Sequence, residues 1–339
     1  MMRDNICIFS KVLHKQSGEE LEAAYLQEGT YIESMQLDGP KLVLVYADPE
    51  NYIKSHLRIR EYDEFSVSFG DSFRENGVSE KDDFTVLTCT PQQDGTVKLN
   101  LMASTVYSMK KIADKTRIFA QQGIPEILQA FSGGARLDVG KFPVVENYHN
   151  IAGERPSALL RQIAGEHGAH LWYARGRISM RRFDELFARD PAITFHWGRL
   201  KDENSIVRYT QPSVQMRAQE ASVRTFTGWN EVTGRVKTSP DSPVLSRSGS
   251  KPTVITSSPN TFVLGNGPVA TKTAIDFVAL GNMSVTAGQS VKLMWHTPDP
   301  ANPINEGLPD KVVVEAVAHW YSGQRYYCRV KGAVALEPF

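Results

Sequence analysis

Residues Thr116–Phe131 read TRIFAQQGIPEILQAF, and residues Asn147–Arg182 read NYHNIAGERPSALLRQIAGEHGAHLWYARGRISMRR. Both stretches interrupt short apolar runs with glycine and proline, a pattern typical of small helices and tight turns. Neither contains a group of residues arranged as a catalyst requires. We therefore expect both to be parts of a scaffold, in a structural and interaction protein rather than an enzyme.

Each stretch predicts one helix. In the first, Pro125 opens a short helix that Gly133-Gly134 ends. In the second, Pro156 begins a longer helix, because a proline in the first turn has no amide that needs a partner. The apolar stripe of the longer helix, and the glycine in the left-handed position after it, are Leu159, Leu160, Ile163 and Gly168.

A hairpin is predicted after the second helix. His170–Tyr173 and Arg177–Arg181 are strand-like and flank the turn residues Ala174-Arg175-Gly176. Together with the two helices, this hairpin makes residues 113–195 a small α/β unit.

The chain on either side of this unit is predicted to form strands. We expect an α+β, β-rich fold with two strand-rich domains, residues 1–112 and 196–339, and the α/β unit inserted between them. Asp94-Gly95 carries a hairpin signal. The predicted strands are Lys41–Ala47, Phe65–Phe69, Phe84–Thr90, Thr96–Leu101, Ile206–Tyr209, Ser213–Met216, Ala221–Phe226, Val291–Trp295, Lys311–His319 and Arg325–Val330.

Two of the β segments echo each other. Phe65–Asp71 precedes an Asp-Phe-Thr-Val strand and then Gly95, and Gln289–Trp295 precedes an Asp-Lys-Val-Val strand and then Gly323. The spacing from the aspartate to the glycine fits one strand plus a turn in both cases. The echo predicts a structural repeat, with a chance likeness as the alternative.

Residues 238–260, TSPDSPVLSRSGSKPTVITSSPN, are rich in serine and proline. This composition predicts a long exposed loop. Two interpretations stay open: a loop that is disordered, or an arm that becomes ordered on a neighbouring subunit.

The composition excludes several classes of protein. The 339 residues include 38 basic and 38 acidic residues, so no overall field draws the chain to nucleic acid or to a membrane surface. The three cysteines lie far apart and predict neither a disulfide framework nor a zinc ribbon. No apolar run has the length of a secretory signal or a membrane span, so we expect synthesis in a cytoplasm.

Three local patterns follow one another in a fixed order. An R-I-F run precedes a P-E-I-L run, a helix of the form LLRxIxxExG precedes an aromatic strand, and a G-x-x-V-x-L strand precedes a strand containing V-x-H. In this order the chain resembles the baseplate hub proteins of contractile-tailed bacteriophages (the late control protein D family), which are similar to the hub half of VgrG-type spike proteins of type VI secretion. The residues that carry the resemblance are Arg117, Ile118, Phe119, Pro125, Leu159, Leu160, Gly168, Trp172, Gly288, Val291 and His319.

The resemblance implies a structural role in a tail. Hubs of this family form homotrimers in which each chain gives two antiparallel β-barrel domains, so that six barrels join a sixfold tail tube to a threefold central spike. For this chain the resemblance implies one barrel in residues 1–112 and one in residues 196–339. The implied partners are further copies of the chain, the tail tube or a tube-initiator protein, the central spike protein and a tape-measure protein. DNA is implied only as passing cargo during ejection.

The resemblance also implies where the protein is located and which part of the tail another protein supplies. The protein is expected in the virion, in the tail baseplate, after assembly in the host cytoplasm, without a catalytic residue, cofactor or metal. Because the sequence reaches Phe339 without a needle-forming segment, we expect a separate protein to supply the spike.

Four further motifs have both a functional and a structural interpretation. The H-x-x-H pair lacks the additional ligands that a zinc site needs. The Gly-Gly segment lacks the Gly-Lys-Ser/Thr ending of a phosphate-binding loop. The two adjacent carboxylates point in different directions and so do not form the acid pair of a glycosidase. For these we expect packing, a helix cap and a surface turn. For the fourth, an arginine cluster beside aromatic residues, we expect a hairpin face or an assembly contact rather than nucleic-acid stacking. The motifs are His167 with His170, Gly133–Arg136, Asp184 with Glu185, and Arg175, Arg177, Arg181 and Arg182 beside Trp172 and Tyr173.

Two other functions remain as alternatives. A tail-associated cell-wall hydrolase would need an acid pair or a metal cluster, and the sequence indicates neither. A receptor- or glycan-binding tail-tip protein is suggested by Trp295, Trp320 and Tyr321. These aromatic residues fall in strand patterns, so we expect most of them to be buried.

Overall fold

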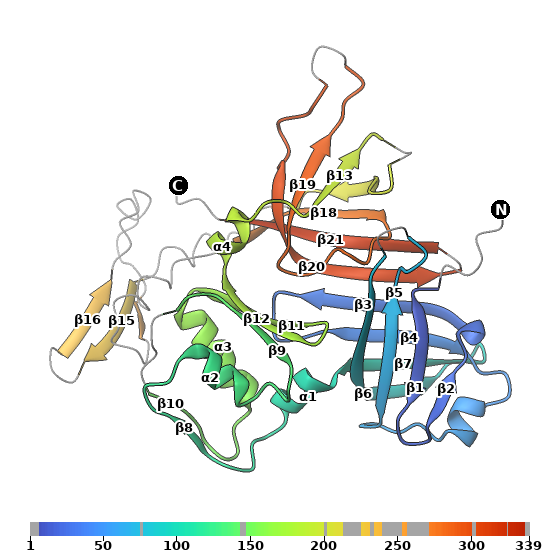
Figure 1. The fold of residues 1–339 in the computed structure, drawn as a ribbon, viewed down its shortest axis with the longest axis horizontal. Helices are drawn as coiled ribbons and strands as arrows, with labels where there is room; N and C mark the ends of the chain where they lie inside the picture. The colour runs from blue at the N-terminus through green and yellow to red at the C-terminus, as the bar shows by residue number, and fades with distance from the viewer. Residues whose placement is uncertain are drawn as a thin grey trace.

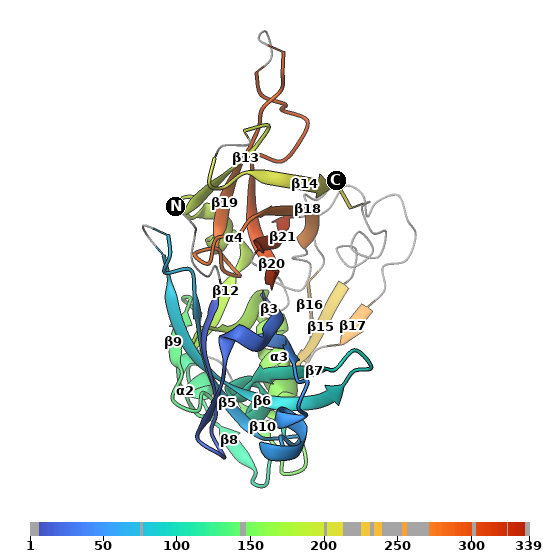
Figure 2. The same cartoon turned by 90° about the vertical axis from the view of Figure 1, so that its right-hand side faces the viewer.

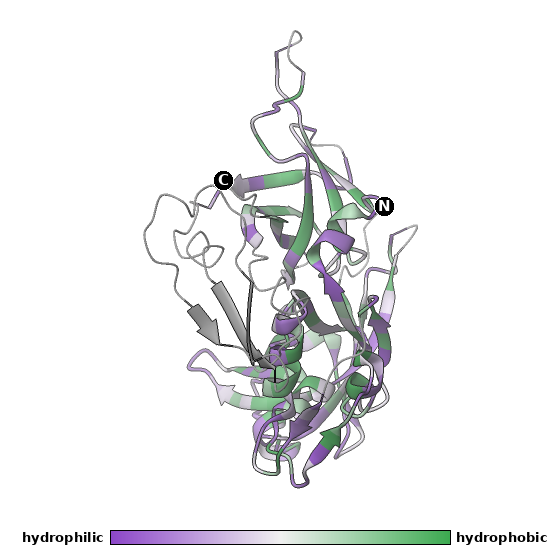
Figure 3. Ribbon diagram, turned by 90° about the vertical axis from the view of Figure 1, so that its left-hand side faces the viewer, coloured by the Kyte–Doolittle hydropathy of each residue, from purple (hydrophilic) through white to green (hydrophobic). Residues whose placement is uncertain are grey.

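The computed structural model describes residues 7–74, 77–142, 147–199, 202–212, 225–230, 234–238, 253–255, 271–299, 303–323 and 325–335. The fold is β-rich with a few short helices, as predicted, and most strands belong to one thirteen-stranded sheet (Figure 1). Apolar and polar segments alternate along its strands (Figure 3), as expected when one face of a sheet is buried. No helix among the described residues is long and apolar enough to cross a membrane.

The first part of the sheet, here the first β half, is antiparallel throughout. Its strands lie in the order β3-β4-β7-β6-β5-β1-β2, and a 3-10 turn (Ala23–Tyr25) and a π-helical turn (Tyr52–His56) connect some of them. The predicted hairpin at Asp94-Gly95 joins β6 to β7, with Gly95 at φ +76°. The strands are β1 (Phe9–His14), β2 (Glu19–Leu21), β3 (Leu26–Ser34), β4 (Lys41–Ala47), β5 (Glu64–Gly70), β6 (Ser79–Pro91) and β7 (Thr96–Ala103).

The last part of the sheet, the second β half, lies above the first in Figure 2. Its strands lie in the order β14-β18-β21-β20-β19-β13. They are β13 (Ile193–Trp197), β14 (Ile206–Thr210), β18 (Thr271–Leu280), β19 (Ser290–Trp295), β20 (Lys311–Ser322) and β21 (Arg325–Ala335).

The two β halves repeat one topology. Taken in chain order, β1, β3, β4, β5, β6 and β7 correspond to β13, β14, β18, β19, β20 and β21, and each set has the same neighbours in the sheet. The segments that echo each other in the sequence are β5 to β7 and β19 to β21, two antiparallel meanders. The predicted repeat is therefore present in the strand order. The halves differ in one pairing, since β1 pairs with β5 antiparallel and β13 pairs with β19 parallel.

One strand, β20, joins the two halves. Along one edge it pairs with β19 at Lys311–Val313 and then with β3 at Ala316–Ser322, while β21 follows its other edge. The described strands of the two halves thus form one continuous sheet instead of the two separately closed barrels that we predicted. The reason lies in β3, whose outer edge pairs with β20 and not with its own half. In the second half, a single bridge between His196 and Ser205 links β13 to the start of β14.

The α/β unit lies beside the first half (Figure 1). Helix α1 (Ser104–Lys110) leads into it from β7, and α3 (Pro156–Glu166) begins at the predicted proline. The predicted hairpin is formed by β11 (Ala169–Ala174) and β12 (Arg177–Arg182), and β12 also pairs in parallel with β9 (Arg136–Val139). The remaining elements are β8 (Arg117–Phe119), α2 (Ile124–Gln129), β10 (Tyr148–Asn150) and α4 (Phe183–Ala188).

A small separate sheet corrects one prediction. Residues 238–260 were predicted to be a loop, but Thr253–Ile255 forms β17, which pairs in parallel with β15 (Thr225–Asn230). The third strand of this sheet is β16 (Gly234–Thr238). The pairing is between segments far apart in the chain, so local composition did not reveal it. Most of 238–260, the predicted strand Ser213–Met216 and the start of Ala221–Phe226 lie outside the described residues.

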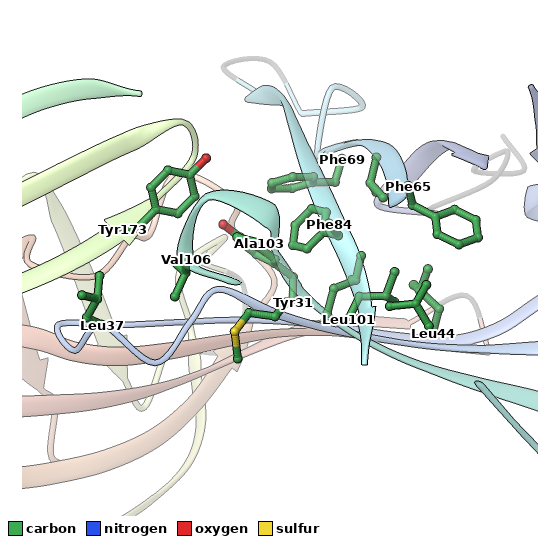
Figure 4. Packing of buried hydrophobic residues seen from close by; sticks show 14 of the residues in the cluster. Tyr31, Leu37, Leu44, Phe65, Phe69, Phe84, Leu101, Ala103, Val106 and Tyr173 are labelled. Atoms are coloured by element: carbon green, nitrogen blue, oxygen red, sulfur yellow. The ribbon is translucent and has the colours of Figure 1, made fainter. Parts of the chain in front are cut away.

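Three apolar clusters hold the fold together. The largest fills the first half and continues into the α/β unit; Figure 4 shows Tyr31, Phe69 and Phe84 beside Val106. A second fills the inner face of the second half around Trp295. The third lies between them and contains Trp172, Phe183 and Ala287. Since all three units share buried surface, we expect them to stabilise one another.

Candidate functional site at the junction of the three units

A buried ion pair lies where the two β halves and the α/β unit meet. Glu33 on β3 is completely buried, and its Oε1 accepts a hydrogen bond from Nε of Arg175 at 2.6 Å. Its Oε2 accepts hydrogen bonds from the hydroxyl of Thr286 at 2.7 Å and from the amide of Ala287 at 3.1 Å. The carboxylate therefore contacts both other units, and each of its oxygens has a partner.

The guanidinium group of Arg175 reaches into the second half from the turn of the β11–β12 hairpin. Arg175 has φ +50° and Gly176 has φ +70°, so the turn runs through left-handed backbone. Arg175 also donates to the carbonyls of Met283 at 2.7 Å and Val285 at 3.0 Å. Both carbonyls belong to residues 281–289, the segment between β18 and β19, called the 281–289 loop below. The loop is thereby fixed by a side chain of the α/β unit.

The charges of this pair are stabilised by their surroundings. Burial by itself raises the pKa of the Glu33 carboxyl, but Arg175, His319 and Thr286 together outweigh burial and hold this pKa below its ordinary value. Burial lowers the pKa of Arg175, and Glu33 more than offsets this effect. Both groups are therefore charged at neutral pH. Removing either one would leave the other as an uncompensated buried charge, which is strongly destabilising.

His319, from β20, is fully buried in the same network. Its Nε2 lies 3.1 Å from the carbonyl of Val285 and its Nδ1 lies 2.8 Å from the hydroxyl of Tyr326. Burial, reinforced by the nearby Arg175 charge, lowers the pKa of His319 to about 4, so the ring is neutral at neutral pH. Because a carbonyl only accepts, Nε2 carries the proton and Nδ1 accepts from Tyr326.

Further polar contacts connect the same units. Asp71 accepts a hydrogen bond from the amide of Met283 at 2.7 Å, and Arg74 donates to the carbonyl of Gly281 at 2.5 Å. Asp82 on β6 accepts from the hydroxyl of Tyr173 on β11 at 2.7 Å. The 281–289 loop is therefore held by the first half as well as by the α/β unit.

A close apolar contact completes the junction. Gly288 has φ +80°, and a Cβ atom there would overlap the ring of Trp172, which lies against the loop backbone. A glycine is thus required for two reasons, its left-handed backbone and the space that the indole occupies. The ring is almost completely buried.

The junction brings together only some of the residues that the resemblance selected. Trp172, Gly288 and His319 lie in it, and Val291 is buried close by on β19. Leu159 and Leu160 are buried on α3, and Gly168 follows that helix at φ +58°. Arg117, Ile118, Phe119 and Pro125 lie elsewhere, on β8 and at the start of α2.

Sequence reasoning missed the centre of the junction. Glu33 lies on a strand that the pattern did not reveal, and we predicted Arg175 on a hairpin face or in an assembly contact. Tyr31 and Glu33 are buried and alternate with half-buried neighbours in a period of two, but the neighbour between them is the apolar Ile32, so the residue types alone do not mark Glu33 as buried. No local signal marks Thr286, which lies 253 residues from its partner Glu33.

The other candidate motifs meet the structural expectations only in part. His167 and His170 are packed in apolar surroundings beside Phe142 and Phe183, as expected, and burial lowers the pKa of both rings. Gly133 and Gly134 have positive φ, but they lie beyond Ala130, the C-cap residue of α2, and so do not cap that helix themselves. Asp184 and Glu185 lie in the first turn of α4 and not in the predicted surface turn, and they pair with Arg182 and Arg181.

Two observations bear on chemistry. Within the described residues, no group of three or more His, Cys, Asp or Glu side chains is arranged to hold a metal ion. The three cysteines are free, and burial raises the pKa of the Cys328 thiol to about 12.

The outer face of the joined sheet is the second notable feature. One register row crosses six strands from β18 to β7, and its members are Leu280, Tyr327, Trp320, Thr30, Val43 and Asn100. Trp320 is 44% exposed and stacks on Tyr327, so the prediction that strand aromatics are buried fails here, although it holds for Trp295 and Tyr321. We call this row and the adjacent Val278, Ala318 and Ile32 the outer sheet face. It spans the line where the two halves meet.

Comparison with known proteins gives the fold a context. No protein-family model and no curated protein sequence matches the chain. Two solved structures of similar fold are a tail protein from Neisseria meningitidis MC58 (TM-score 0.61, 10% identity, 96% of this chain and 95% of that one) and a 43 kDa tail protein of prophage MuSo2 from Shewanella oneidensis (TM-score 0.59, 12% identity, 97% and 96%).

Type VI secretion proteins have a similar fold with a lower TM-score. A type VI secretion component of E. coli, described as similar to the T4 tail proteins gp27 and gp5, has a TM-score of 0.52 at 9% identity and covers 92% of this chain and 74% of its own. The resemblance found in the sequence is thus matched by the fold, across nearly the whole chain.

Proposed function

We propose, from the fold that this chain shares with phage tail proteins and type VI spike-related proteins, that it is a structural tail protein and acts as a baseplate hub. In this role three copies form a ring that joins a sixfold tail tube to a threefold central spike. The tube or its initiator, the spike protein and a tape-measure protein are the partners of this proposal, and the virion tail is its location.

The observation that carries the proposal is the repeated topology. Each chain contributes two sets of six strands with the same order. Three such chains arranged about a threefold axis present six similar units, which is the arrangement needed to match a sixfold ring. A chain without an internal repeat would present only three. We further propose that each half acts as a barrel-like unit in the ring, supported in the second half by the bridge between His196 and Ser205.

The junction supports a mechanical role. A hub under load must keep its two halves in a fixed orientation, and we propose that the buried Glu33–Arg175 pair and the hydrogen-bonded 281–289 loop do this. We place a contact between subunits on the outer sheet face, because exposed tryptophan and tyrosine are enriched at protein interfaces.

The test is the mass of the purified full chain by light scattering at increasing concentration, alone and with the spike protein encoded beside it. We expect a species three times the 37.8 kDa of the chain in at least one sample. We expect Trp320→Glu to reduce that species, while Tyr62→Glu, at a tyrosine exposed elsewhere on the first half, leaves it unchanged. A monomer under all conditions would contradict the hub role.

The exposed Trp320–Tyr327 stack also favours a second candidate, a glycan-binding tail-tip protein. Aromatic faces of this kind offer an apolar platform with a polar rim. Binding of the wild type to an immobilised glycan array, lost in Trp320→Glu, would favour this candidate over a subunit contact.

A further inference from the structure

Two cavities adjoin each other where α1 passes into the α/β unit. One has a volume of about 360 Å³ and the other about 260 Å³. Lys111 and Ile112 line both, so these two residues form the wall between them. Each cavity is near the lower end of the size range of ligand pockets, roughly 300–1,000 Å³, a size suited to side chains of a docked segment.

Apolar side chains line part of each cavity. Leu87, Met102 and Tyr107 are among those of the larger one, and Met109, Phe131 and Pro156 are among those of the smaller one, which also has a polar lining. Ile112, which lines both, is 65% exposed. A single exposed isoleucine is ordinary on a protein surface, but here it lies between two hollows that each contain apolar side chains. We call the two adjoining cavities and Ile112 the groove.

Cations surround this groove in a chain that has no net charge. The two linings contain five cations and one carboxylate, that of Asp114. Lys110 forms an ion pair with Asp38 at 2.9 Å. No carboxylate in the described part of the chain lies within 4 Å of the other four cations, which are Lys111, Lys115, Arg117 and Arg155. Among the described residues, the lining of the groove thus has an excess of positive charge, five cations to one carboxylate.

Two of the cations are held against the apolar surface. Nζ of Lys111 lies 4.9 Å from the ring centre of Tyr107, and the guanidinium carbon of Arg117 lies 5.0 Å from that of Phe131. These cation–π contacts keep positive charge at the rim of the cavities. They also cover the aromatic faces on which the bases of a single-stranded nucleic acid would stack. The arrangement therefore favours a protein ligand over a nucleic acid.

We propose that this groove binds an acidic segment of a partner protein, in which bulky apolar side chains enter the two cavities and flanking carboxylates face Lys111, Lys115, Arg117 and Arg155. Complementary charge would guide the segment to the groove and fix its register, and the buried apolar side chains would supply most of the affinity. This assignment does not depend on the hub role, because it rests on the groove alone.

The test begins with an mRNA-display library of random 12-residue peptides, selected on the immobilised full-length protein. Enriched peptides are then made with a fluorescent label and titrated by anisotropy against the wild type and three variants, Lys111→Glu, Arg155→Glu and Ile112→Ser. Lys292→Glu, at an exposed lysine on β19, is the matched control. Thermal melts of every variant verify folding, and a labelled 12-nucleotide single-stranded DNA is titrated in parallel.

We expect the enriched peptides to combine Asp or Glu with Leu, Ile, Phe or Trp. Their Kd should rise at least tenfold in each groove variant, remain unchanged in Lys292→Glu, and rise with salt concentration. The proposal is overturned if the enriched peptides lack acidic residues, if no peptide is enriched, if folded groove variants bind as the wild type does, or if the DNA binds more tightly than the peptides.

Discussion

Asp82 shows how one residue at the junction responds to its surroundings. Its Oδ1 accepts hydrogen bonds from Tyr173 and from the amide of Asp83, whereas its Oδ2 is buried and has no partner within the described residues. Burial raises the pKa of this carboxyl to about 6, against 3.8 for the free group. Between these two values the folded protein holds a proton that the unfolded chain has released. The contribution of Asp82 to stability is therefore greatest below pH 4 and falls as the pH rises to about 6.

At this scale we predict a pH-dependent effect of Asp82→Asn, which keeps the oxygen that accepts from Tyr173 and removes the titration. Between pH 4 and pH 7, the free energy of unfolding of the wild type should fall relative to that of the variant by on the order of 2 kcal/mol. Urea unfolding at pH 4, 5, 6 and 7 measures the difference.

Asp94→Asn is the control for this prediction. Asp94 lies in an exposed turn, where hydrogen bonds from Thr96 lower its pKa. Because this lowered pKa lies below 3.8, the wild type should gain stability relative to this variant as the pH rises through that range, the opposite sign, and the difference should change little between pH 5 and pH 7. A difference between wild type and Asp82→Asn that does not vary with pH would show that Asp82 titrates normally in the folded state.

At the scale of the element, the 281–289 loop decides how the second half meets the α/β unit. It has little regular structure of its own. Its amides donate hydrogen bonds to Asp71 and Glu33, its carbonyls accept hydrogen bonds from Arg74 and Arg175, and its backbone contacts Trp172. The packing of this loop should therefore be sensitive to a single added methyl group.

We predict that Gly288→Ala destabilises the protein more than Gly18→Ala. Both glycines have similar backbone, at φ +80° and φ +74°, but a Cβ at Gly18 would meet no atom within 4 Å, whereas one at Gly288 would overlap Trp172. Gly18→Ala should therefore cost only the left-handed strain, about 1–2 kcal/mol. Gly288→Ala should cost about 1–3 kcal/mol more, for overpacking. Equal losses in urea unfolding would mean that the indole moves aside freely.

At the scale of the whole molecule, the continuous sheet and the junction make the two halves one structural unit. Strand β20 pairs with strands of both halves, and the Glu33–Arg175 pair lies beside that seam. Domains connected only by a linker would unfold separately. Here the shared edge and the shared buried charges should couple the two unfolding events.

We predict that Arg175→Met lowers the free energy of unfolding by about 3–5 kcal/mol, because Glu33 is left buried without its counter-charge. The variant should also uncouple the halves. Hydrogen exchange followed by mass spectrometry in moderate urea should show β5–β7 and β19–β21 opening together in the wild type and separately in the variant.

Two further variants make this prediction specific. Arg177→Met changes an exposed arginine of the same hairpin and should cost little. Adding Glu33→Gln to Arg175→Met should restore part of the lost stability, since no unpaired charge then remains. If the halves still open together in Arg175→Met, the β20–β3 pairing alone couples them.

Features that depend on neighbouring residues could be predicted before the fold was known. The proline that begins α3, the glycine after it, the β11–β12 hairpin and the Asp94-Gly95 turn are all set by local backbone preferences. The strand order common to both halves could also be detected in the sequence, because the two meanders have the same spacing of strand and turn residues.

How these elements join depends on contacts between distant parts of the chain. Any strand edge offers the same kind of backbone donors and acceptors, so the outer edge of β3 could pair with a strand of its own half or with β20. Which of the two pairs with β3 depends on how the two halves are placed relative to each other. The roles of Glu33, Arg175 and Thr286 follow from contacts between segments more than a hundred residues apart. Local sequence patterns report backbone preference and burial, and they carry no information about which distant partner neutralises a buried charge.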